Sequence, residues 1–477
     1  MERWALPAIL VLGALNFFWQ LGSSSYFVDE TLSIEASLPS LGQLLHVVRT
    51  TETNPWAYFV FLHEWLARTG SQSEWVTRLP SAVAGIALVG AVYWMAGAFL
   101  DRRHALLAAA FCALSPLVLE YAQQVRMYVF VMLAVTIAVG ATVRASSGSA
   151  DRARLLAVGA AAAALSLWLH YTAAFVILPL CVWLGTRTSI PWRSRVAFIG
   201  VCVIAALAVL PLLIAQYDAN PGGGLIGFAG LTWTNVVRIA QTPFDPRSAD
   251  TVNIVRLMGV AAVVGSILVL ALRKRSTVRN DRLLVALGLL APLALLAGGI
   301  AGKDVVITRY TAVAAPFLLT AIAAAVAVLP RAPAIVLLAA TLVVAGLGLA
   351  DSHSRTGFYA PAREAIQYIG ASHEPTHPIV MPVQGGSDIA LGYYGQQLLH
   401  PAPQLIASTS TAQVDAALAA RRPLWIVSQI PNGSVPDTSL LATATAVLRP
   451  VRYRPVSVRA FTTTTTFTVV LAVPTGR

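Results

Sequence analysis

Apolar residues fill most of this chain in long runs, and short polar segments separate the runs. The runs span roughly 15 to 22 residues, the length that a helix needs to cross a hydrocarbon core about 30 Å thick. Helices are expected because every backbone polar group in lipid needs a hydrogen-bond partner inside its span. The pattern predicts about eleven transmembrane helices, near residues 5–21, 80–100, 105–119, 128–143, 155–169, 172–186, 196–215, 252–272, 283–300, 311–329 and 333–350.

Two connections between these spans are too long to be simple turns. The first, residues 22–79, contains the amphipathic pieces LGQLLHVVRT and AYFVFLHEWLAR, which are predicted to lie flat in the membrane interface. The second, residues 216–251, contains NPGGG and QTPFDPRS and is rich in turn-forming residues.

The C-terminal part of the chain has a different pattern. Helical segments (PAREAIQYIG and TAQVDAALAAR) alternate with strand-like ones (HPIVMPV, PLWIVSQI and TFTVVLAV), which is typical of a small α/β unit. The repetitive FTTTTTFTVV is predicted to be a strand because it is rich in β-branched residues. We therefore expect a transmembrane domain over residues 1–350 and an α/β domain over residues 351–477.

The composition agrees with a polytopic membrane protein, since 57% of the residues are hydrophobic and only 11% are charged. The net charge of +12 would otherwise suggest nucleic acid. Here, however, the arginines gather in short loops on one side of the predicted spans, as the positive-inside rule describes. The expected partner is thus the lipid bilayer and not nucleic acid. We expect a multi-pass protein of the plasma membrane, with a cytoplasmic N-terminus and an extracytoplasmic C-terminal domain.

Two adjacent carboxylates, Asp29 and Glu30, follow the first predicted span in the stretch SSYFVDETLSIEA. A carboxylate at the outer membrane boundary is placed to take a proton from a hydroxyl group or to hold a cation. The alternative is structural, because DETLSIEA starts a helix naturally and acidic residues favour the first turn.

A second polar cluster lies in SPLVLEYAQQVRMYVF. Glu120, Gln124 and Tyr128 would share one face if this stretch were a continuous helix, and Arg126 lies between two spans. Charged groups at such a depth are costly and generally line a cavity. The alternative is a boundary ion pair between Glu120 and Arg126.

Two further outward turns carry polar side chains. His170 and Tyr171 lie in the first, where an interfacial anchor is the structural alternative to a substrate contact. Lys303, Arg309 and Tyr310 lie in the second. The two cations either extend to the lipid headgroups or form a phosphate clamp, for which guanidinium geometry is suited.

In this order, the motifs resemble the GT-C superfamily of membrane glycosyltransferases, and within it the glycosyltransferase family 39 and ArnT-like enzymes that use polyprenyl-phosphate sugars. The resemblance covers residues 1 to about 370. It rests on the Asp29-Glu30 pair, on Asn54-Pro55 at the place of a His-Pro-Pro-like segment, on Gly70 to Ser81, on Ser115, Pro116, Tyr121, Arg126 and Tyr128, on His170-Tyr171, and on Arg309-Tyr310 followed by Pro316.

The resemblance implies transfer of a sugar from a polyprenyl-phosphate donor to a hydroxyl group of a protein, glycolipid or polysaccharide, with inversion at the anomeric carbon. Asp29 would be the base and Glu30 its orienting neighbour, whereas Arg126, Lys303 and Arg309 would stabilise the phosphate leaving group. The expected substrate-binding residues are Asn54, Glu120, Gln124, Arg126, Tyr128, His170, Tyr171, Lys303, Arg309 and Tyr310.

Several alternatives stay open at this point. Gln124 stands where many relatives have an acid, so no cofactor is certain and a divalent cation (Mg or Mn) rests on Glu120 as a substitute. Mannose and arabinose are both compatible with the motifs. The rival functions are a lipid-linked sugar flippase and a non-catalytic scaffold that binds the cell wall. A transporter should show paired repeats and charges near the membrane midplane, and neither feature stands out in the sequence.

Overall fold

The computed structural model divides the chain into two compact units. One, which we call the membrane unit, comprises Met1–Leu21, Ala36–Gln72 and Val76–His353, and the other, the C-terminal unit, comprises Gly22–Glu35, Ser73–Trp75 and Ser354–Arg477. The structure describes residues 2–148, 150–219, 230–245, 253–273, 278–303, 305–354, 361–372, 375–383, 386–431, 444–445, 448–462 and 465–475. Two short pieces of the first loop thus group with the C-terminal residues rather than with the spans.

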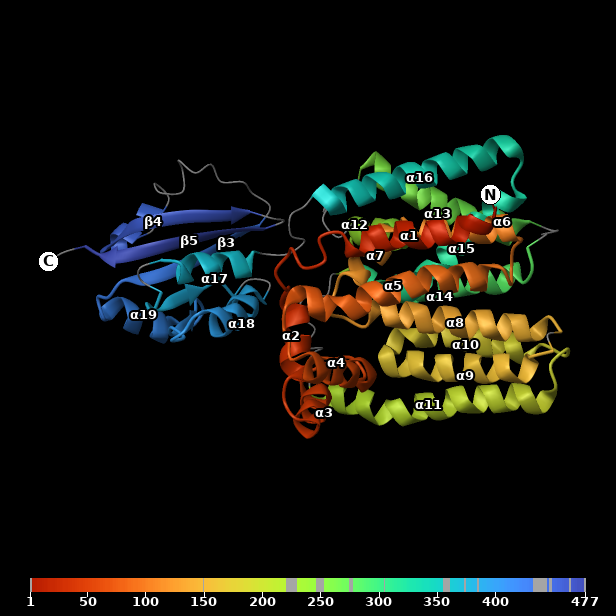
Figure 1. The fold of residues 1–477 in the computed structure, drawn as a ribbon, viewed down its shortest axis with the longest axis horizontal. Helices are drawn as coiled ribbons and strands as arrows, with labels where there is room; N and C mark the ends of the chain where they lie inside the picture. The colour runs from red at the N-terminus through yellow and green to blue at the C-terminus, as the bar shows by residue number, and fades with distance from the viewer. Residues whose placement is uncertain are drawn as a thin grey trace. The chain divides into compact units, whose positions relative to one another are not determined.

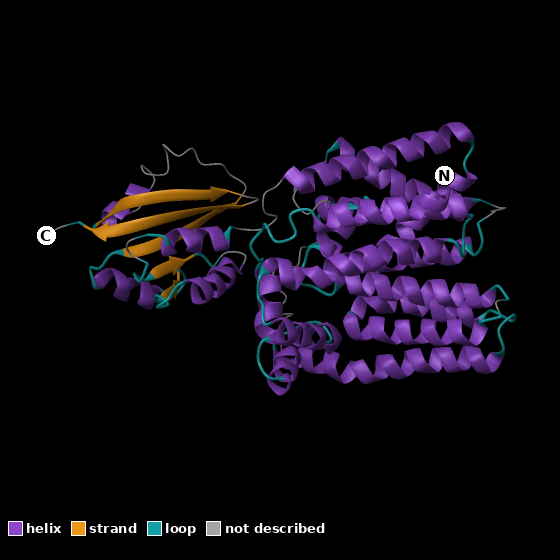
Figure 2. Ribbon diagram, viewed as in Figure 1, coloured by secondary structure: helices purple, strands orange, loops and turns teal. Residues whose placement is uncertain are grey.

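Helices build the membrane unit, and α8, α9, α10 and α11 run side by side in it (Figures 1 and 2). The helices of the first half are α1 (Ala5–Phe18), α2 (Val28–Ser37, which begins in the C-terminal unit), α3 (Leu41–Thr50), α4 (Trp56–Thr69), α5 (Glu74–Ala96), α6 (Arg102–Ala113), α7 (Pro116–Ala122), α8 (Tyr128–Ser146) and α9 (Arg152–Leu169). Those of the second half are α10 (Ala174–Gly185), α11 (Trp192–Ala219), α12 (Trp233–Ala240), α13 (Ile254–Leu272), α14 (Asp281–Ile300), α15 (Ala315–Val328) and α16 (Arg331–Ser354). Short 3-10 helices are η1 (Glu2–Trp4), η2 (Tyr171–Ala173), η3 (Thr242–Phe244) and η4 (Thr308–Ala314).

Among the described residues, eight helices are long and apolar enough to cross a membrane, or nine if α6 and α7, which meet at a bend of 58°, form one span. Two further apolar helices, Ala5–Phe18 and Tyr171–Gly185, are shorter. Each of the eleven apolar segments predicted from the sequence falls on one of these helices. The prediction of a helical, polytopic membrane protein is therefore confirmed.

The two amphipathic pieces of the first loop are also helices. They are α3 and α4, and α3 begins with a capping box in which Ser40 and Gln43 bond each other's backbone N–H groups. Leu44 and Val48 form the buried stripe of α3, whereas His46 and Arg49 on its other side are exposed. The placement of these helices in the membrane interface stays a prediction.

The predicted start of the second span at residue 80 is wrong, because α5 already begins at Glu74. Pro80 lies inside the helix, where it has no N–H to donate to the carbonyl oxygen of Val76 four residues earlier. The indole N–H of Trp65 donates to that oxygen instead, at 2.9 Å. A side chain from α4 thus compensates for the hydrogen bond that the proline removes.

The condition under which Glu120, Gln124 and Tyr128 would share one face, a continuous helix, is not met. Helix α7 ends at Ala122 and α8 begins at Tyr128, so residues 123–127 form a non-helical connection. The hydroxyl of Ser81 on α5 donates to the backbone oxygen of Gln124 at 2.6 Å. A neighbouring helix therefore satisfies a backbone group inside the break, which would otherwise be costly in a buried place.

The C-terminal unit contains a five-stranded mixed sheet with the strand order β2-β1-β3-β5-β4. Strand β1 pairs parallel with β2 and β3, and β5 pairs antiparallel with β3 and β4. The elements are α17 (Ala362–Gly370), β1 (Ile379–Met381), α18 (Ser387–Leu398), β2 (Leu405–Ala407), α19 (Thr411–Ala419), β3 (Leu424–Pro431), a 3-10 helix (Arg449–Val451), β4 (Tyr453–Thr462) and β5 (Thr465–Pro474). The predicted α/β domain is confirmed.

The Thr-rich stretch of this unit departs from its prediction. It was expected to be one strand, but β4 ends at Thr462 and β5 begins at Thr465, and the two pair antiparallel with Thr462 opposite Thr466. The β-branched residues therefore fill the ends of two paired strands. The side chains of Phe467 and Trp425, on neighbouring strands, are buried in the unit.

Candidate active site

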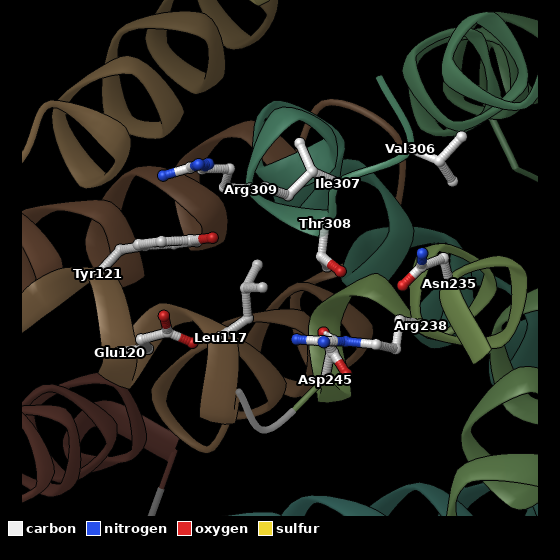
Figure 3. A pocket seen from close by; sticks show the side chains of 10 residues that line it. All are labelled: Leu117, Glu120, Tyr121, Asn235, Arg238, Asp245, Val306, Ile307, Thr308 and Arg309. Carbon is white, nitrogen blue, oxygen red and sulfur yellow. Dashed lines mark hydrogen bonds and ion pairs between the residues drawn. The ribbon is translucent and has the colours of Figure 1, made fainter. Parts of the chain in front are cut away.

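A cavity of about 340 Å³ opens in the membrane unit (Figure 3). Tyr121 and Thr308 approach it from different sides. Two of the predicted site residues, Glu120 and Arg309, line it. The full lining is Leu117, Glu120 and Tyr121 from α7, Asn235 and Arg238 from α12, Asp245 after η3, and Val306, Ile307, Thr308 and Arg309.

One serine joins two walls of this cavity. Ser115 is the N-cap of α7, where its hydroxyl accepts a hydrogen bond from the N–H of Val118, and Pro116 follows it at the first helical position. The same hydroxyl donates to the backbone oxygen of Pro243 in η3 at 2.5 Å. This bond fixes the start of α7, which carries Glu120, beside η3, which precedes Asp245.

A buried ion pair forms part of the lining. Arg238 Nε lies 3.0 Å from Asp245 Oδ2, and only 1% of Asp245 is exposed. Thr308 donates a hydrogen bond to this carboxylate, and the charge of Arg256 also acts on it. Burial raises the pKa of Asp245 above its ordinary value, although Arg238 and Arg256 oppose this shift.

Tyr121, which lines the cavity, begins a row of aromatic rings that includes three of the predicted site residues. The ring centroids of Tyr121 and Tyr128 are 4.7 Å apart, those of Tyr128 and His170 are 5.4 Å apart, and those of His170 and Tyr310 are 5.7 Å apart. The neighbouring segments α7 and the start of α8 therefore meet here with two segments from much later in the chain, the turn after α9 and η4.

His170 sits in this row with only 2% of its surface exposed. Its Nδ1 atom lies 3.1 Å from the backbone nitrogen of Thr172, and a backbone N–H can only donate. We therefore assign the proton to Nε2, which has no hydrogen-bond partner among the described residues. Burial, with the charges of Arg126 and Arg309, lowers the pKa of His170 to about 3, so the ring stays neutral near pH 7.

Glu120 and Gln124 meet although no continuous helix joins them. Gln124 Nε2 donates to Glu120 Oε1 at 2.9 Å, and both side chains are buried. The glutamine that replaces an acid is thus a neutral donor to Glu120. No group of three or more His, Cys, Asp or Glu side chains in the described part of the chain is arranged to hold a metal ion. The arrangement at Glu120 and Asp245 does not fit a divalent cation, because an amide or guanidinium group already contacts each carboxylate.

Asn54 and Tyr171 are linked to each other through Gln216. The hydroxyl of Tyr171 donates to Gln216 Oε1 at 2.7 Å, and Gln216 Nε2 donates to the backbone oxygens of Val48 and Asn54 at 2.7 and 3.0 Å. Gln216, on α11, is therefore bonded to η2, to α3 and to the segment that follows α3. Neither Asn54 nor Tyr171 is among the residues that line the cavity.

Lys303 is the predicted cation that the structure places differently. It is exposed, and it is absent from the cavity lining, which the same segment reaches with Val306 to Arg309. The alternative interpretation, a cation at the surface, agrees with this position.

Asp29 and Glu30 occupy the first turn of α2, within the C-terminal unit. Glu30 is fully buried, and its Oε2 accepts a hydrogen bond from the N–H of Phe27, which precedes the helix, at 3.2 Å. Glu30 therefore helps to begin helix α2, as the structural alternative for this acidic pair describes. Asp29 is half-buried in the same turn.

The sequence did not single out Asn235, Arg238, Asp245, Arg256 or Thr308. The first three belong to the 216–251 segment, which was described only as turn-rich, and the motif NPGGG lies outside the described residues. The sequence signal for these residues was an amphipathic helix followed by an aspartate. In the structure, Val237 and Ile239 of α12 are buried and Arg238 pairs with Asp245.

Comparison with known proteins agrees with this fold. A family model described as dolichyl-phosphate-mannose-protein mannosyltransferase matches residues 43–214. The chain is similar to ArnT from Cupriavidus metallidurans, solved with undecaprenyl phosphate, at 13% identity and a TM-score of 0.55 over 98% of this chain and 97% of that one. It is also similar to the oligosaccharyltransferase AglB from Archaeoglobus fulgidus, solved with an inhibitory peptide and a dolichol-phosphate, at 10% identity and a TM-score of 0.53 over 89% of this chain and 69% of that one. No curated protein sequence matches.

The arrangement of the spans and the appended α/β domain define a membrane protein of the GT-C fold. The match to the family model, from α3 to α11, adds a similarity in sequence to this similarity in fold. The chain is thus similar to the mannosyltransferase family over residues 43–214, and its fold is similar to those of ArnT and AglB.

Proposed function

We propose that this protein transfers a sugar of the mannose or arabinose type from a polyprenyl-phosphate donor to an acceptor hydroxyl group on the extracytoplasmic side of the plasma membrane, with inversion. The acceptor is a protein, a glycolipid or a polysaccharide. The observation that carries this proposal is that two guanidinium groups, those of Arg238 and Arg309, line the cavity of the membrane unit. The polyprenyl phosphates held by ArnT and AglB support it through the shared fold.

The charges around the cavity favour an anionic ligand. Arg238 and Arg309 line it, Arg126 acts on His170, and Arg256 acts on Asp245, whereas the carboxylates are Glu120 and Asp245. Guanidinium forks match the geometry of phosphate oxygens, so several of them near one cavity suit a phosphate group. In the proposal, Arg238 and Arg256 thus support the phosphate site in place of Lys303.

The reaction is a direct displacement at the anomeric carbon. The acceptor oxygen forms a bond to that carbon while the bond between the carbon and the phosphate oxygen breaks, and the lipid monophosphate leaves. The arginines stabilise the charge that develops on the phosphate, and the Nε2–H of His170 supplies a neutral donor. The acceptor hydroxyl has a pKa far above 7, so it gives its proton to a base. We assign this role to Asp29, as the resemblance implies, with Glu30 fixing the turn that carries it.

Transfer by the purified protein in lipid nanodiscs tests the proposal. Radiolabelled polyprenyl-phosphate-mannose and polyprenyl-phosphate-arabinose are supplied in parallel, with an alkyl glycoside as the acceptor. We expect transfer by the wild type and a loss of about 100-fold or more in Asp29→Asn, since a general base contributes roughly 10²–10⁴-fold. Glu35→Gln is the matched control because Glu35 is an exposed carboxylate of the same helix. Full transfer by Asp29→Asn removes Asp29 as the base, and absence of transfer by the wild type with both donors contradicts the function.

A further inference from the structure

The C-terminal unit includes two short pieces of the first loop, Gly22–Glu35 and Ser73–Trp75. The first piece carries Asp29, and the second begins the long helix α5. Side chains from α17 and α18, hundreds of residues later in the chain, hold both pieces in place. Two of these side chains, Arg363 and Tyr394, form with Glu74 of the second piece the centre of what we call the loop network.

Arg363, near the start of α17, reaches both loop pieces with one guanidinium group. Its Nη1 lies 2.8 Å from Glu74 Oε1 and donates to the backbone oxygen of Gly22 at 3.3 Å. Its Nη2 donates to the backbone oxygen of Ser23 at 2.6 Å and to Glu364 at 2.9 Å. A fork with several donors is needed for this, and only arginine carries one.

Tyr394, on α18, joins the same two pieces through its hydroxyl. The hydroxyl accepts a hydrogen bond from the backbone N–H of Tyr26 at 2.8 Å and donates to Glu74 Oε1 at 2.6 Å. The rings of Tyr26 and Tyr394 stack with centroids 6.0 Å apart. Both residues are buried, so water does not substitute for these bonds.

Two further contacts fix the backbone between Ser25 and the start of α2. The hydroxyl of Ser25 accepts from the N–H of Arg363 at 3.1 Å and donates to Glu364 Oε2 at 2.7 Å. Gly386, which precedes α18 with φ of +74°, lies so close to Val28 that an added Cβ atom would stand 2.7 Å from a methyl carbon of that residue. The chain is therefore held on both sides of the short segment that leads to Asp29.

We propose that Glu74, Arg363 and Tyr394 are positioning residues for the Asp29 turn, which belongs to the same unit as they do. This inference rests on the proposed function of Asp29. A base acts only within hydrogen-bond distance of its proton, and a displacement of about 1 Å costs roughly 10²-fold in rate. The network acts on the turn alone, so it affects turnover and leaves donor binding unchanged.

Steady-state kinetics of full-length variants in nanodiscs test this role. Tyr394→Phe removes the acceptor for the N–H of Tyr26 and the donor to Glu74. We expect kcat to fall by about tenfold or more while the KM for the polyprenyl-phosphate sugar changes by less than about twofold. Arg363→Ala should lower kcat by a similar factor, and Arg363→Lys should recover part of it, because lysine keeps the charge opposite Glu74 and loses the fork.

Tyr368→Phe is the matched control. Tyr368 lies on α17 of the same unit, and its hydroxyl bonds Ser457 on β4, away from the loop network. Equal kcat values for Tyr394→Phe and Tyr368→Phe overturn the proposal, as does a loss expressed only in KM.

Hydrogen exchange gives a second readout that needs no activity. The amides of residues 22–35 should exchange faster in Tyr394→Phe than in Tyr368→Phe, because the N–H of Tyr26 loses its acceptor. Unchanged protection overturns the positioning role. If the wild type transfers neither sugar while this protection is lost as expected, the proposed function fails and the structural role of the network stands.

Discussion

Two clusters of polar side chains in this protein contain the same kinds of residues but differ in the number of their arginines. Arg238 and Arg309 line the cavity together with the carboxylates of Glu120 and Asp245, and the charge of Arg126 acts on His170. In the loop network, the guanidinium group of Arg363 lies between the carboxylates of Glu74 and Glu364. Several guanidinium groups therefore lie near the cavity, whereas one arginine serves the described loop network.

The clusters also differ in how their donors are used. His170 beside the cavity has a buried Nε2–H without a partner among the described residues. In the loop network, Tyr394 both donates and accepts, and Arg363 contacts two carboxylates and two backbone oxygens. A buried donor without a partner costs free energy unless a ligand supplies the acceptor. The open donor of His170 is what a ligand site requires, whereas the hydrogen bonds of the loop network fix the backbone.

Among the substitutions that test this comparison, the largest loss of kcat is expected for those of Arg309. Arg309→Ala removes a fork that the proposed function assigns to the leaving phosphate, and loss of one such donor costs about 10²–10³-fold in kcat. Arg309→Lys should fall between this variant and the wild type, because it keeps the charge and loses the bidentate geometry. The measurement is sugar transfer at saturating donor, with inhibition by free polyprenyl phosphate as a second readout.

Arg331→Ala is the control for this variant, since Arg331 is an exposed arginine at the start of α16. Transfer by Arg309→Ala within about threefold of the wild type would place the phosphate elsewhere. The cavity cluster would then have no assigned role in ligand binding that distinguishes it from the loop network.

Local patterns predicted much of the fold. The apolar runs predicted the membrane helices, and amphipathic periodicity predicted α3 and α4, because both signals reside in neighbouring residues. The start of α5 was missed because it depends on Trp65, which supplies the hydrogen bond that Pro80 removes. The gap between the spans predicted at 105–119 and 128–143 agrees with the break before α8, where Ser81 of another helix satisfies the carbonyl of Gln124.

The candidate site was predictable to a similar extent. Motif order singled out Glu120 and Arg309, which line one cavity, and His170, on which the charge of Arg309 acts. Arg238 and Asp245 join them through a single long-range bond, from Ser115 to Pro243, and no sequence pattern encodes it. The same limit applies to the loop network, which depends on contacts between the first loop and α17 and α18.

A smaller effect, on acid stability, is expected at His170. The unfolded chain protonates this imidazole near its ordinary pKa of 6.5, whereas the folded protein does so only near 3. The unfolded state therefore binds more protons between these values, and the wild type loses stability as the pH falls through this window, by about 2 kcal/mol from this residue at pH 5.

His170→Gln keeps a side-chain donor and removes the titration. Thermal unfolding in detergent at pH 7.5 and pH 5 measures the difference, and we expect a smaller decrease on acidification in the variant. The pH profile of transfer should show no ionisation from His170 between pH 5 and 8, because the ring stays neutral there. An equal decrease of stability in the wild type and in His170→Gln would show that the imidazole has an ordinary pKa in the folded protein and is not buried beside the cavity.

The smallest effect is expected at Tyr171, which contributes to neither cluster. Its hydroxyl donates to Gln216, whose amide also bonds the backbone oxygens of Val48 and Asn54. Tyr171→Phe removes one hydrogen bond and should lower the free energy of unfolding by about 1 kcal/mol. Because the cavity lies elsewhere in the membrane unit, kcat and KM should stay within about twofold of the wild type. A tenfold loss of kcat at unchanged stability would instead make Tyr171 a substrate contact, and the ligand site would then extend from the cavity to Gln216.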